Sequence, residues 1–379
     1  PKDQSNFWKK WLFHLYNYQA QTINNIIMKR YAEAVLNGHP DKFCDCVADA
    51  IVAEAIKADP EAFAQIEVGV WSDEAWISGT IVSRHEMART PTDILVNVGL
   101  SIRLNATNHI DATRYRVRDV VCQYREDPTE GRKVCDDQSI VVGYAGYDIH
   151  TRFLPPEQYA VHTLVMQLWQ DCFTGPLQGC GPDGKLLMTM REEANHWVIE
   201  KILVTLQHPK HMSLLDMTLG VHQSLQKCYL AMQQRDSRWQ QNWGDIEILV
   251  NPNGPLWRAG SDGDNGQTGR KLVMDYYGPR IALGGGALAG KHPAHIDRMA
   301  ARCARNAAIE AVKAGTKDCT IRLAYAPNTN APLQEIWEME QSGLKPKNGH
   351  FNFDAMLSKT SCLEFQNEIG VGVYGWKLD

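Results

Sequence analysis

The stretch DGDNGQTGRKLVMDYYGPRIALGGGALAGKHPAHID, Asp262–Asp297, brings together three kinds of anion-binding group. Its glycine-rich turns, the second of them at Gly284–Gly286, let the backbone approach a ligand and point its N–H groups at it. Arg270 and Lys271 follow the first turn and Lys291 follows the second, and such cations supply the charge that a polyphosphate needs. The aspartates of the same run suit Mg²⁺, which usually takes one or two carboxylates and shares the phosphate oxygens. The stretch therefore predicts a site for a phosphate chain and its metal ion.

The run from Gly285 to Lys291 matches the first part of a Walker A loop, G-x4-G-K. That motif continues with Ser or Thr, whose hydroxyl holds Mg²⁺, whereas this chain has His292 followed by Pro293. Because proline favours the first position of a helix, we expect a helix from Pro293 with Lys291 left in the loop. An ordinary P-loop is therefore not expected.

Length and composition are those of a soluble globular chain. It has 379 residues, 44% of them hydrophobic and 22% charged, which is enough for two or three domains with their own cores. The formal net charge of −5 argues against nucleic acid as the main partner. Ten cysteines stand without C-x-x-C pairs, so zinc is not expected, and reduced thiols in a cytoplasmic protein are the simplest interpretation.

Residues 1–27 are predicted to be an N-terminal extension. Lys9 and Lys10 precede a short aromatic run, Trp11–Tyr16, which faintly resembles a signal peptide. The run is too short to span a bilayer and no small-residue cleavage site follows it, so no membrane is expected. We expect either a helix that packs on a neighbouring subunit or a poorly ordered tail.

Asn37–Lys42, NGHPDK, is the first cluster of chemical groups. Its glycine allows a turn, its proline suits the first position of a helix, and apolar residues then repeat every four positions until Asp59. His39 and Asp41 stand at the start of this predicted helix. By itself the histidine would more often be structural than catalytic, and only its neighbours favour a functional role.

Three further carboxylates have two interpretations each. Asp45 and Asp49 follow Asp41 at the spacing of one helical turn, and a solvated helix face is the expected reason for both. Glu67 falls inside a predicted strand, where a carboxylate is usually exposed or paired at an edge, although an ion ligand remains open.

The remaining pattern mixes strands and helices. Strands are predicted at Ile66–Val70, Ala75–Val82, Val117–Val121, Ile140–Tyr144, Leu186–Met190, Ile202–Leu206, Ile246–Val250 and Thr320–Ala326. Helices are predicted from Leu154 through Trp169, after Leu206, and at Ile296–Ala314 with Gly315 at the end. Gln123–Val134 is polar and predicts a surface loop. No internal repeat is evident.

Taken in order, these motifs resemble those of the S-adenosylmethionine synthetase (methionine adenosyltransferase) family. The matching motifs are GHPDK at Gly38–Lys42, Glu67 in its strand, DDQ and GYA between Asp136 and Ala145, GPDGK at Gly181–Lys185, QH at Gln207-His208, NPNG at Asn251–Gly254, GDNGQTGRK at Gly263–Lys271, and GGGALAGK with HIDR at Gly284–Arg298. No single motif is decisive, whereas so many in one order are specific. The resemblance covers residues 31–325 and is faint beyond them.

The resemblance implies an enzyme that makes S-adenosylmethionine from ATP and L-methionine and releases phosphate and diphosphate. The implied fold is α+β, with three similar domains, each a sheet backed by helices, here at 28–127, 134–245 and 246–379. It also implies Mg²⁺, two ions to a site, and K⁺. The implied assembly is a cytoplasmic homodimer or dimer of dimers with active sites at the subunit interface.

The resemblance also assigns roles to residues. Catalysis would fall to His39, Lys185, Arg270, Lys271 and Lys291, which with Asp183, Asp264 and Ala287 would also bind ATP. Methionine would be bound by Gln123, Asp137, Asp264 and His295, Mg²⁺ by Asp41 and Asp297, and K⁺ by Glu67. Cations aimed at a leaving triphosphate lower its barrier. Because a thioether sulfur is already a good nucleophile, the first step needs no general base.

The departures from the family pattern concentrate on the adenine and methionine side. Leu283 stands where many members have His, Pro255-Leu256 replaces an Arg-Phe pair that stacks on adenine, and a Glu expected near Thr80 is absent. His295 replaces a Lys, which predicts weak methionine binding that improves toward about pH 6. The loop at 123–134 is short.

These departures leave three hypotheses. The first is an active but divergent synthetase. The second is a relative that uses another thioether or only cleaves triphosphate, and the third is a non-catalytic regulatory subunit. Against the third, a decayed copy would lose its costly buried charges first, and they remain here.

Overall fold

The computed structural model describes residues 28–104, 110–130, 134–193, 196–339, 348–360, 365, 369–370 and 372–376. The predicted extension, 1–27, lies outside this range. Within it, no helix is both long and apolar enough to cross a membrane.

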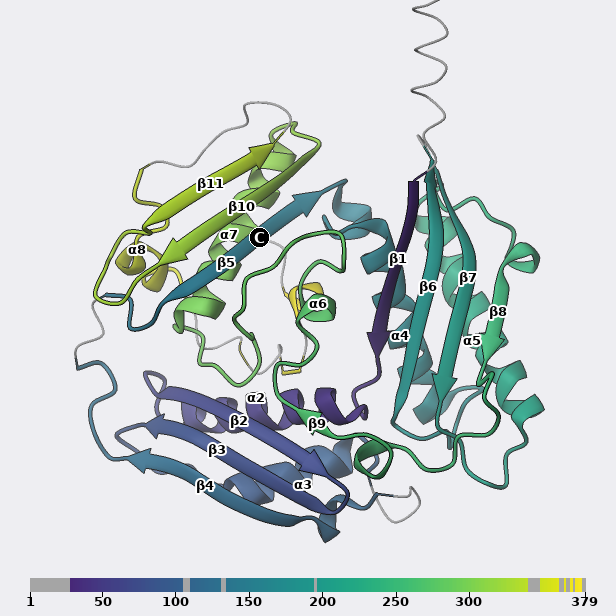
Figure 1. Cartoon of the computed structure of the whole chain (residues 1–379), viewed down its shortest axis with the longest axis horizontal. Helices are drawn as coiled ribbons and strands as arrows, with labels where there is room; N and C mark the ends of the chain where they lie inside the picture. Colours follow the sequence, from purple (N-terminus) through teal and green to yellow (C-terminus); the bar gives the residue numbers. More distant parts are fainter. Residues whose placement is uncertain are drawn as a thin grey trace, which may run out of the picture.

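The described residues form three sheets around a common centre (Figure 1). The first has the order β4-β3-β2-β9, with β2 at Phe63–Trp71, β3 at Glu74–Val82, β4 at Arg116–Tyr124 and β9 at Gly266–Gln267. The second has the order β1-β6-β7-β8, with β1 at Met28–Val35, β6 at Gly184–Glu193, β7 at His196–Leu206 and β8 at Glu247–Val250. The third has the order β11-β10-β5, with β5 at Ser139–Gly146, β10 at Asp318–Tyr325 and β11 at Gln334–Met339. Each sheet thus includes one strand that comes from a distant part of the chain.

Helices pack on each of the three sheets (Figure 1). The helices are α2 at Pro40–Ala58, α3 at Pro91–Ser101, α4 at Pro156–Thr174, α5 at Leu214–Arg235, α6 at Leu272–Asp275, α7 at Ile296–Lys313 and α8 at Phe353–Leu357. Short 3₁₀ turns lie at Ala112–Arg114, Ile149–Thr151, Trp243–Asp245, Gly260–Asp262 and Val373–Gly375. Helix α2 contacts β2, α4 contacts β1 and β6, and α7 contacts β5 and β10. The predicted α+β class is confirmed.

Alternation along the strands produces this arrangement. In β2 every second side chain is buried, and Ile66 and Val68 reach the same core as Val47 and Ile51 of α2. The opposite faces of the sheets keep large apolar side chains in solvent. Tyr31 of β1, Val120 of β4 and Ile140 of β5 are 62%, 63% and 61% exposed.

The start of α7 corrects one expectation. The first turn was expected from Pro293, whereas the helix begins at Ile296, the start of the predicted span Ile296–Ala314, because His295 caps it, its Nδ1 accepting from the N–H of Asp297. Lys291 lies outside the helix, as expected.

Candidate functional site

Two glycine-rich segments, Gly263–Lys271 and Gly284–Lys291, meet at the start of α2. A Cβ on Gly266 would lie 2.4 Å from the carbonyl carbon of Pro40, so this strand rests directly on the first turn of the helix. A Cβ on Gly269 would lie 2.9 Å from that of Ala287, so the two segments also touch each other. The fold therefore joins the two halves of the stretch Asp262–Asp297 at one helix end, where α2 carries its partial positive charge.

His39 is held as a neutral hydrogen-bond donor at this place. It is 1% exposed and caps α2, because its Nδ1 accepts from the N–H of Asp41 at 3.2 Å. Burial, together with Lys271 and Lys185, lowers the pKa of His39 to about 3. With Nδ1 accepting, the ring proton is on Nε2, which is buried and has no partner among the described residues. An orphaned buried donor of this kind points to a ligand atom.

The carboxylate of Asp41 faces the cations of the first loop. Its Oδ1 accepts from the N–H of Gln267 at 2.9 Å, and its Oδ2 pairs with the Lys271 ammonium. The Nε of Arg270 lies 3.5 Å from Oδ1. Burial would raise the pKa of Asp41, but the hydrogen bonds from Lys271 and Gln267 outweigh it and the pKa lies below its ordinary value. Asp41 is therefore ionised at neutral pH.

Asp297 repeats the arrangement at the start of α7. Its carboxylate pairs with the Lys291 ammonium and accepts from the Ser139 hydroxyl. As with His39 and Asp41, a buried histidine precedes the aspartate by two residues and caps the helix. His295 is 2% exposed, so it does not face solvent. Burial and then Lys291 lower its pKa, so the predicted gain in methionine binding toward acid pH is also not expected.

A cavity of about 620 Å³ opens beside this second pair. Lys291 and Asp297 line it together with Asp137, Ser139 and Gly286. Asp137 keeps one side-chain contact to the N–H of Gln138 and is otherwise exposed. The structure thus brings Asp137, from a distant part of the sequence, to Lys291 and Asp297 in one concave surface.

Asp183, Lys185 and Asp264 gather on the His39 side. Asp183 is buried and its Oδ2 accepts from the N–H of Gly260 at 2.8 Å. Burial raises its pKa to about 6, although that N–H and Lys185 pull the other way. The N–H of Asp264 donates to the carbonyl of the same Gly260, so both aspartates are bonded to the backbone of one residue. Lys185 is exposed on β6, opposite Val35 at the end of the strand that leads to His39.

Glu67 and Gln123 have different surroundings. Glu67 is half-buried on β2, and burial raises its pKa while Lys291 opposes the shift. No ion pair to Glu67 is present among the described residues, which leaves its carboxylate available to a cation. Gln123 is exposed on the edge strand β4, separated from β2 by β3, and the structure does not bring it to the other predicted residues.

The expectation that Asp45 and Asp49 form a solvated helix face is wrong. They are 0% and 1% exposed. Asp45 accepts from the N–H of Gly269 and Asp49 from that of Gly290, both at 2.9 Å. The segments that cover them follow α2 by more than 200 residues, so no local pattern could show the burial. The equal spacing of the three aspartates was evident in the sequence, but it fits a buried helix face as well as a solvated one.

The residues present fit a metal ion that arrives with a phosphate chain. Within the part of the chain that the structure describes, no group of three or more His, Cys, Asp or Glu side chains could hold a metal. Asp41 and Asp297 instead stand singly beside lysines. Mg²⁺ needs only one or two protein carboxylates when phosphate supplies further oxygens.

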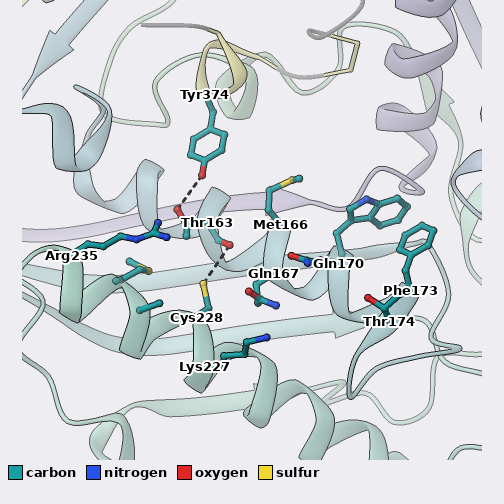
Figure 2. A pocket seen from close by; sticks show the side chains of 13 residues that line it. Thr163, Met166, Gln167, Gln170, Phe173, Thr174, Lys227, Cys228, Arg235 and Tyr374 are labelled. Carbon is teal, nitrogen blue, oxygen red and sulfur yellow. Dashed lines mark hydrogen bonds between the residues drawn. The ribbon is translucent and has the colours of Figure 1, made fainter.

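A second cavity, of about 580 Å³, lies between α4 and α5 (Figure 2). Met166, Phe173, Lys227 and Tyr374 line it, and the Tyr374 hydroxyl is 3.2 Å from that of Thr163. No predicted site residue lines this cavity, and no glycine-rich turn borders it. It is therefore separate from the phosphate-binding site.

Fold and site together define an α+β protein in which two glycine-rich segments place lysines beside single aspartates, an arrangement that suits a phosphate chain and its metal ion. Comparison with known proteins is more specific. Residues 28–123 match the family model of the S-adenosylmethionine synthetase N-terminal domain, and residues 259–349 match that of the C-terminal domain.

Two relatives cover most of the chain. The S-adenosylmethionine synthase of Zymomonas mobilis subsp. mobilis is 32% identical over 315 residues, which are 80% of this chain and 78% of that protein. The S-adenosylmethionine synthase of Parvibaculum lavamentivorans is 28% identical over 325 residues, 82% of this chain and 80% of that protein. The chain belongs to the S-adenosylmethionine synthetase family.

Proposed function

We propose that this chain makes S-adenosylmethionine from ATP and L-methionine, with release of phosphate and diphosphate, at the site formed by the two glycine-rich segments. The chain is an enzyme of the methionine adenosyltransferase class, as its family and both relatives indicate. The observation that carries the site assignment is the repeated pair of a helix-start aspartate and a loop lysine, Asp41 with Lys271 and Asp297 with Lys291.

The pairs prepare the site for a triphosphate. In the structure each lysine is neutralised by its aspartate. The family is metal-dependent, and Mg²⁺ would draw the two aspartates while the lysines turn to the phosphate oxygens. Arg270 and Lys185 add charge at the His39 end. Cations placed in advance cost no reorganisation when charge moves onto the leaving triphosphate.

His39 would act where the bond breaks. Its Nε2–H has no partner among the described residues, and burial keeps the ring neutral, so the ring can donate a hydrogen bond as an uncharged group. Donation to the oxygen that departs from the ribose C5′ stabilises the charge that develops there. The thioether sulfur attacks without a base, and the residues around it serve to position it.

The remaining contacts are proposed by position. Asp183, Asp264 and the backbone of Ala287 would bind the nucleotide, and Asp137, Asp264 and His295 the methionine. Glu67, half-buried near Lys291, would hold K⁺, while Mg²⁺ occupies two positions, at Asp41 and Asp297. Gln123 would reach methionine only from a second chain, since it stands apart from the others in its own.

We propose a homodimer or dimer of dimers with shared sites, and the exposed apolar faces of the sheets support it. Each sheet exposes a large apolar side chain on the face away from its helix, Tyr31, Val120 and Ile140 among them. Burial of such a face against a second copy gains roughly 25 cal/mol per Å² of apolar surface. The division into domains at 28–127, 134–245 and 246–379 is likewise proposed, with the family models at 28–123 and 259–349 in support. We also propose a cytoplasmic location, which the buried free thiols of Cys44, Cys46 and Cys135 support.

Incubation with ATP, methionine, Mg²⁺ and K⁺, followed by mass spectrometry of the products, tests the proposed function. We expect S-adenosylmethionine with one phosphate and one diphosphate for each molecule made. Phosphate release without the sulfonium product would favour a triphosphatase, and a product with another thioether alone would favour altered specificity. No turnover by a folded protein would leave a regulatory subunit.

A further inference from the structure

Helix α2 carries a ladder of three carboxylates, Asp41, Asp45 and Asp49. Each one accepts a backbone N–H from a glycine-rich segment, respectively from Gln267, Gly269 and Gly290, and each distance is 2.9 Å. Four residues of helix advance about 6 Å, so the three bonds follow one another along a single face. The first segment is therefore hydrogen-bonded to α2 through Asp41 and Asp45, and the second through Asp49.

Burial of the Asp45 and Asp49 carboxylates costs free energy. Lys42 donates to Asp45 at 2.9 Å and to Asp275 at 2.7 Å, and Arg298 lies 3.4 Å from Asp49. Burial nevertheless raises the pKa of Asp45 to about 6 and also raises that of Asp49. Apolar side chains of similar volume often stabilise a fold as well as buried ion pairs do. Stability alone is therefore a poor reason for carboxylates here.

The tied glycines cannot be held by side chains of their own. Gly269 and Gly290 have φ of +78° and +77°, a region that favours glycine. A Cβ on Gly290 would lie 2.1 Å from the carbonyl oxygen of Ile66. The backbone N–H is thus the point at which each segment can be fastened. Arg270 and Lys271 directly follow the first tied glycine and Lys291 directly follows the second.

We propose that Asp45 and Asp49 are positioning residues that fix the two glycine-rich segments on α2 and so set the phosphate-binding cations at a fixed separation. The proposal rests on the proposed function only in taking those cations as the phosphate site. Neither carboxylate contacts substrate. Helix α2 thereby fixes the separation of the cations. Asp45 positions the segment that carries Arg270 and Lys271, and Asp49 positions the segment that carries Lys291.

Tripolyphosphate is the probe, because it binds these cations without methionine, and it is used in its diimido form, whose P–N–P bridges the site cannot hydrolyse. Its affinity in Mg²⁺ would be measured by calorimetry for Asp45→Ala, Asp49→Ala and the corresponding Asn variants. Misplacement of groups by about 1 Å can cost on the order of 100-fold, and we expect a loss of that order for the Ala variants. Asparagine keeps an oxygen that accepts the N–H, so the Asn variants should stay closer to the wild type.

Glu54→Ala is the matched control. Glu54 is a buried acid of the same helix, 3% exposed, and it pairs with Arg89 rather than with a glycine-rich segment. Its variant should bind tripolyphosphate like the wild type. Equal losses in Glu54→Ala and Asp49→Ala would show a general effect of the helix and overturn the proposal, as would wild-type affinity in the Asp45→Ala and Asp49→Ala proteins.

Hydrogen exchange of the wild-type protein decides the question if the Ala variants do not fold. The amides of Gly269 and Gly290 should exchange slowly, like those inside α2, because each donates to a buried carboxylate. Exchange as fast as in an open loop would contradict the tie. Both readouts are independent of S-adenosylmethionine synthesis, so failure of the proposed function would not be mistaken for failure of the ladder.

Discussion

Replacing Asp297 by asparagine removes one negative charge from the proposed phosphate site and keeps the shape of the side chain. Asparagine still accepts from the Ser139 hydroxyl, and the cap from His295 to the backbone N–H is unchanged. Lys291 loses its carboxylate partner in this variant. Its ammonium still lies near the carboxylate of Glu67, where it opposes the rise in the pKa of that group. We therefore expect a folded protein whose catalytic rate falls on the order of 100- to 1000-fold, or about 2.7–4 kcal/mol, the cost of one well-placed electrostatic group.

Initial rates of S-adenosylmethionine formation at saturating ATP and methionine give this loss directly, with circular dichroism to confirm the fold. Asp41→Asn should behave in the same way, because Asp41 holds the equivalent place on α2. Asp216→Asn, at an exposed acid in the first turn of α5, is the control that should keep its rate. A rate for Asp297→Asn close to that of the wild type would remove the residue from the metal site.

Four other outcomes are expected. Activity should rise when K⁺ replaces Na⁺, and Glu67→Gln should lose that response; a wild type indifferent to K⁺ at constant ionic strength would remove the potassium site. His295→Lys should lower the Michaelis constant for methionine, since it restores a permanent cation, and an unchanged constant would place His295 outside the pocket. Burial lowers the pKa of His162 to about 4, so the unfolded chain takes up a proton below about pH 6.5 before the folded one does. Stability should thus fall by up to roughly 3 kcal/mol as pH drops through this window, and urea unfolding should show a flatter dependence for His162→Gln. Lys42→Met leaves two buried carboxylates without their cation and should cost about 3–5 kcal/mol in the same assay, whereas a loss of under about 1 kcal/mol would contradict the importance of the pair.

Local signals in the sequence were sufficient for most single elements. The proline after His39 and the apolar repeat predicted the helix that begins at Pro40, and the strand signals predicted the strand that contains Glu67 and the strand that follows it. The motifs around Asp41 and Lys291 predicted a phosphate site because glycine, cation and carboxylate have that chemistry in any fold. Their joining at one end of α2 depends on tertiary structure.

Long-range contacts account for what the sequence did not show. Asp45 was wrongly predicted to be exposed because the segment that buries it, at Gly269, is far away in the chain. The span Ile296–Ala314 placed the start of α7 correctly, whereas the expectation of a helix from Pro293 was wrong because the cap by His295 is visible only in three dimensions. The repeat between the two helix starts was missed because it consists of only a histidine and an aspartate two residues apart, at His39 and at His295.

The central claim is that this site breaks the bond between C5′ of the ribose and the oxygen of the α-phosphate. ATP labelled with ¹⁸O at that bridging oxygen tests it most directly, with methionine, Mg²⁺ and K⁺ present. We predict that the label leaves on the α-phosphorus of the triphosphate, so that it is found in the one inorganic product that contains this phosphorus and is absent from every adenosine-containing product. Label retained in AMP or ADP, without S-adenosylmethionine, would show that water attacks phosphorus instead and would contradict the account.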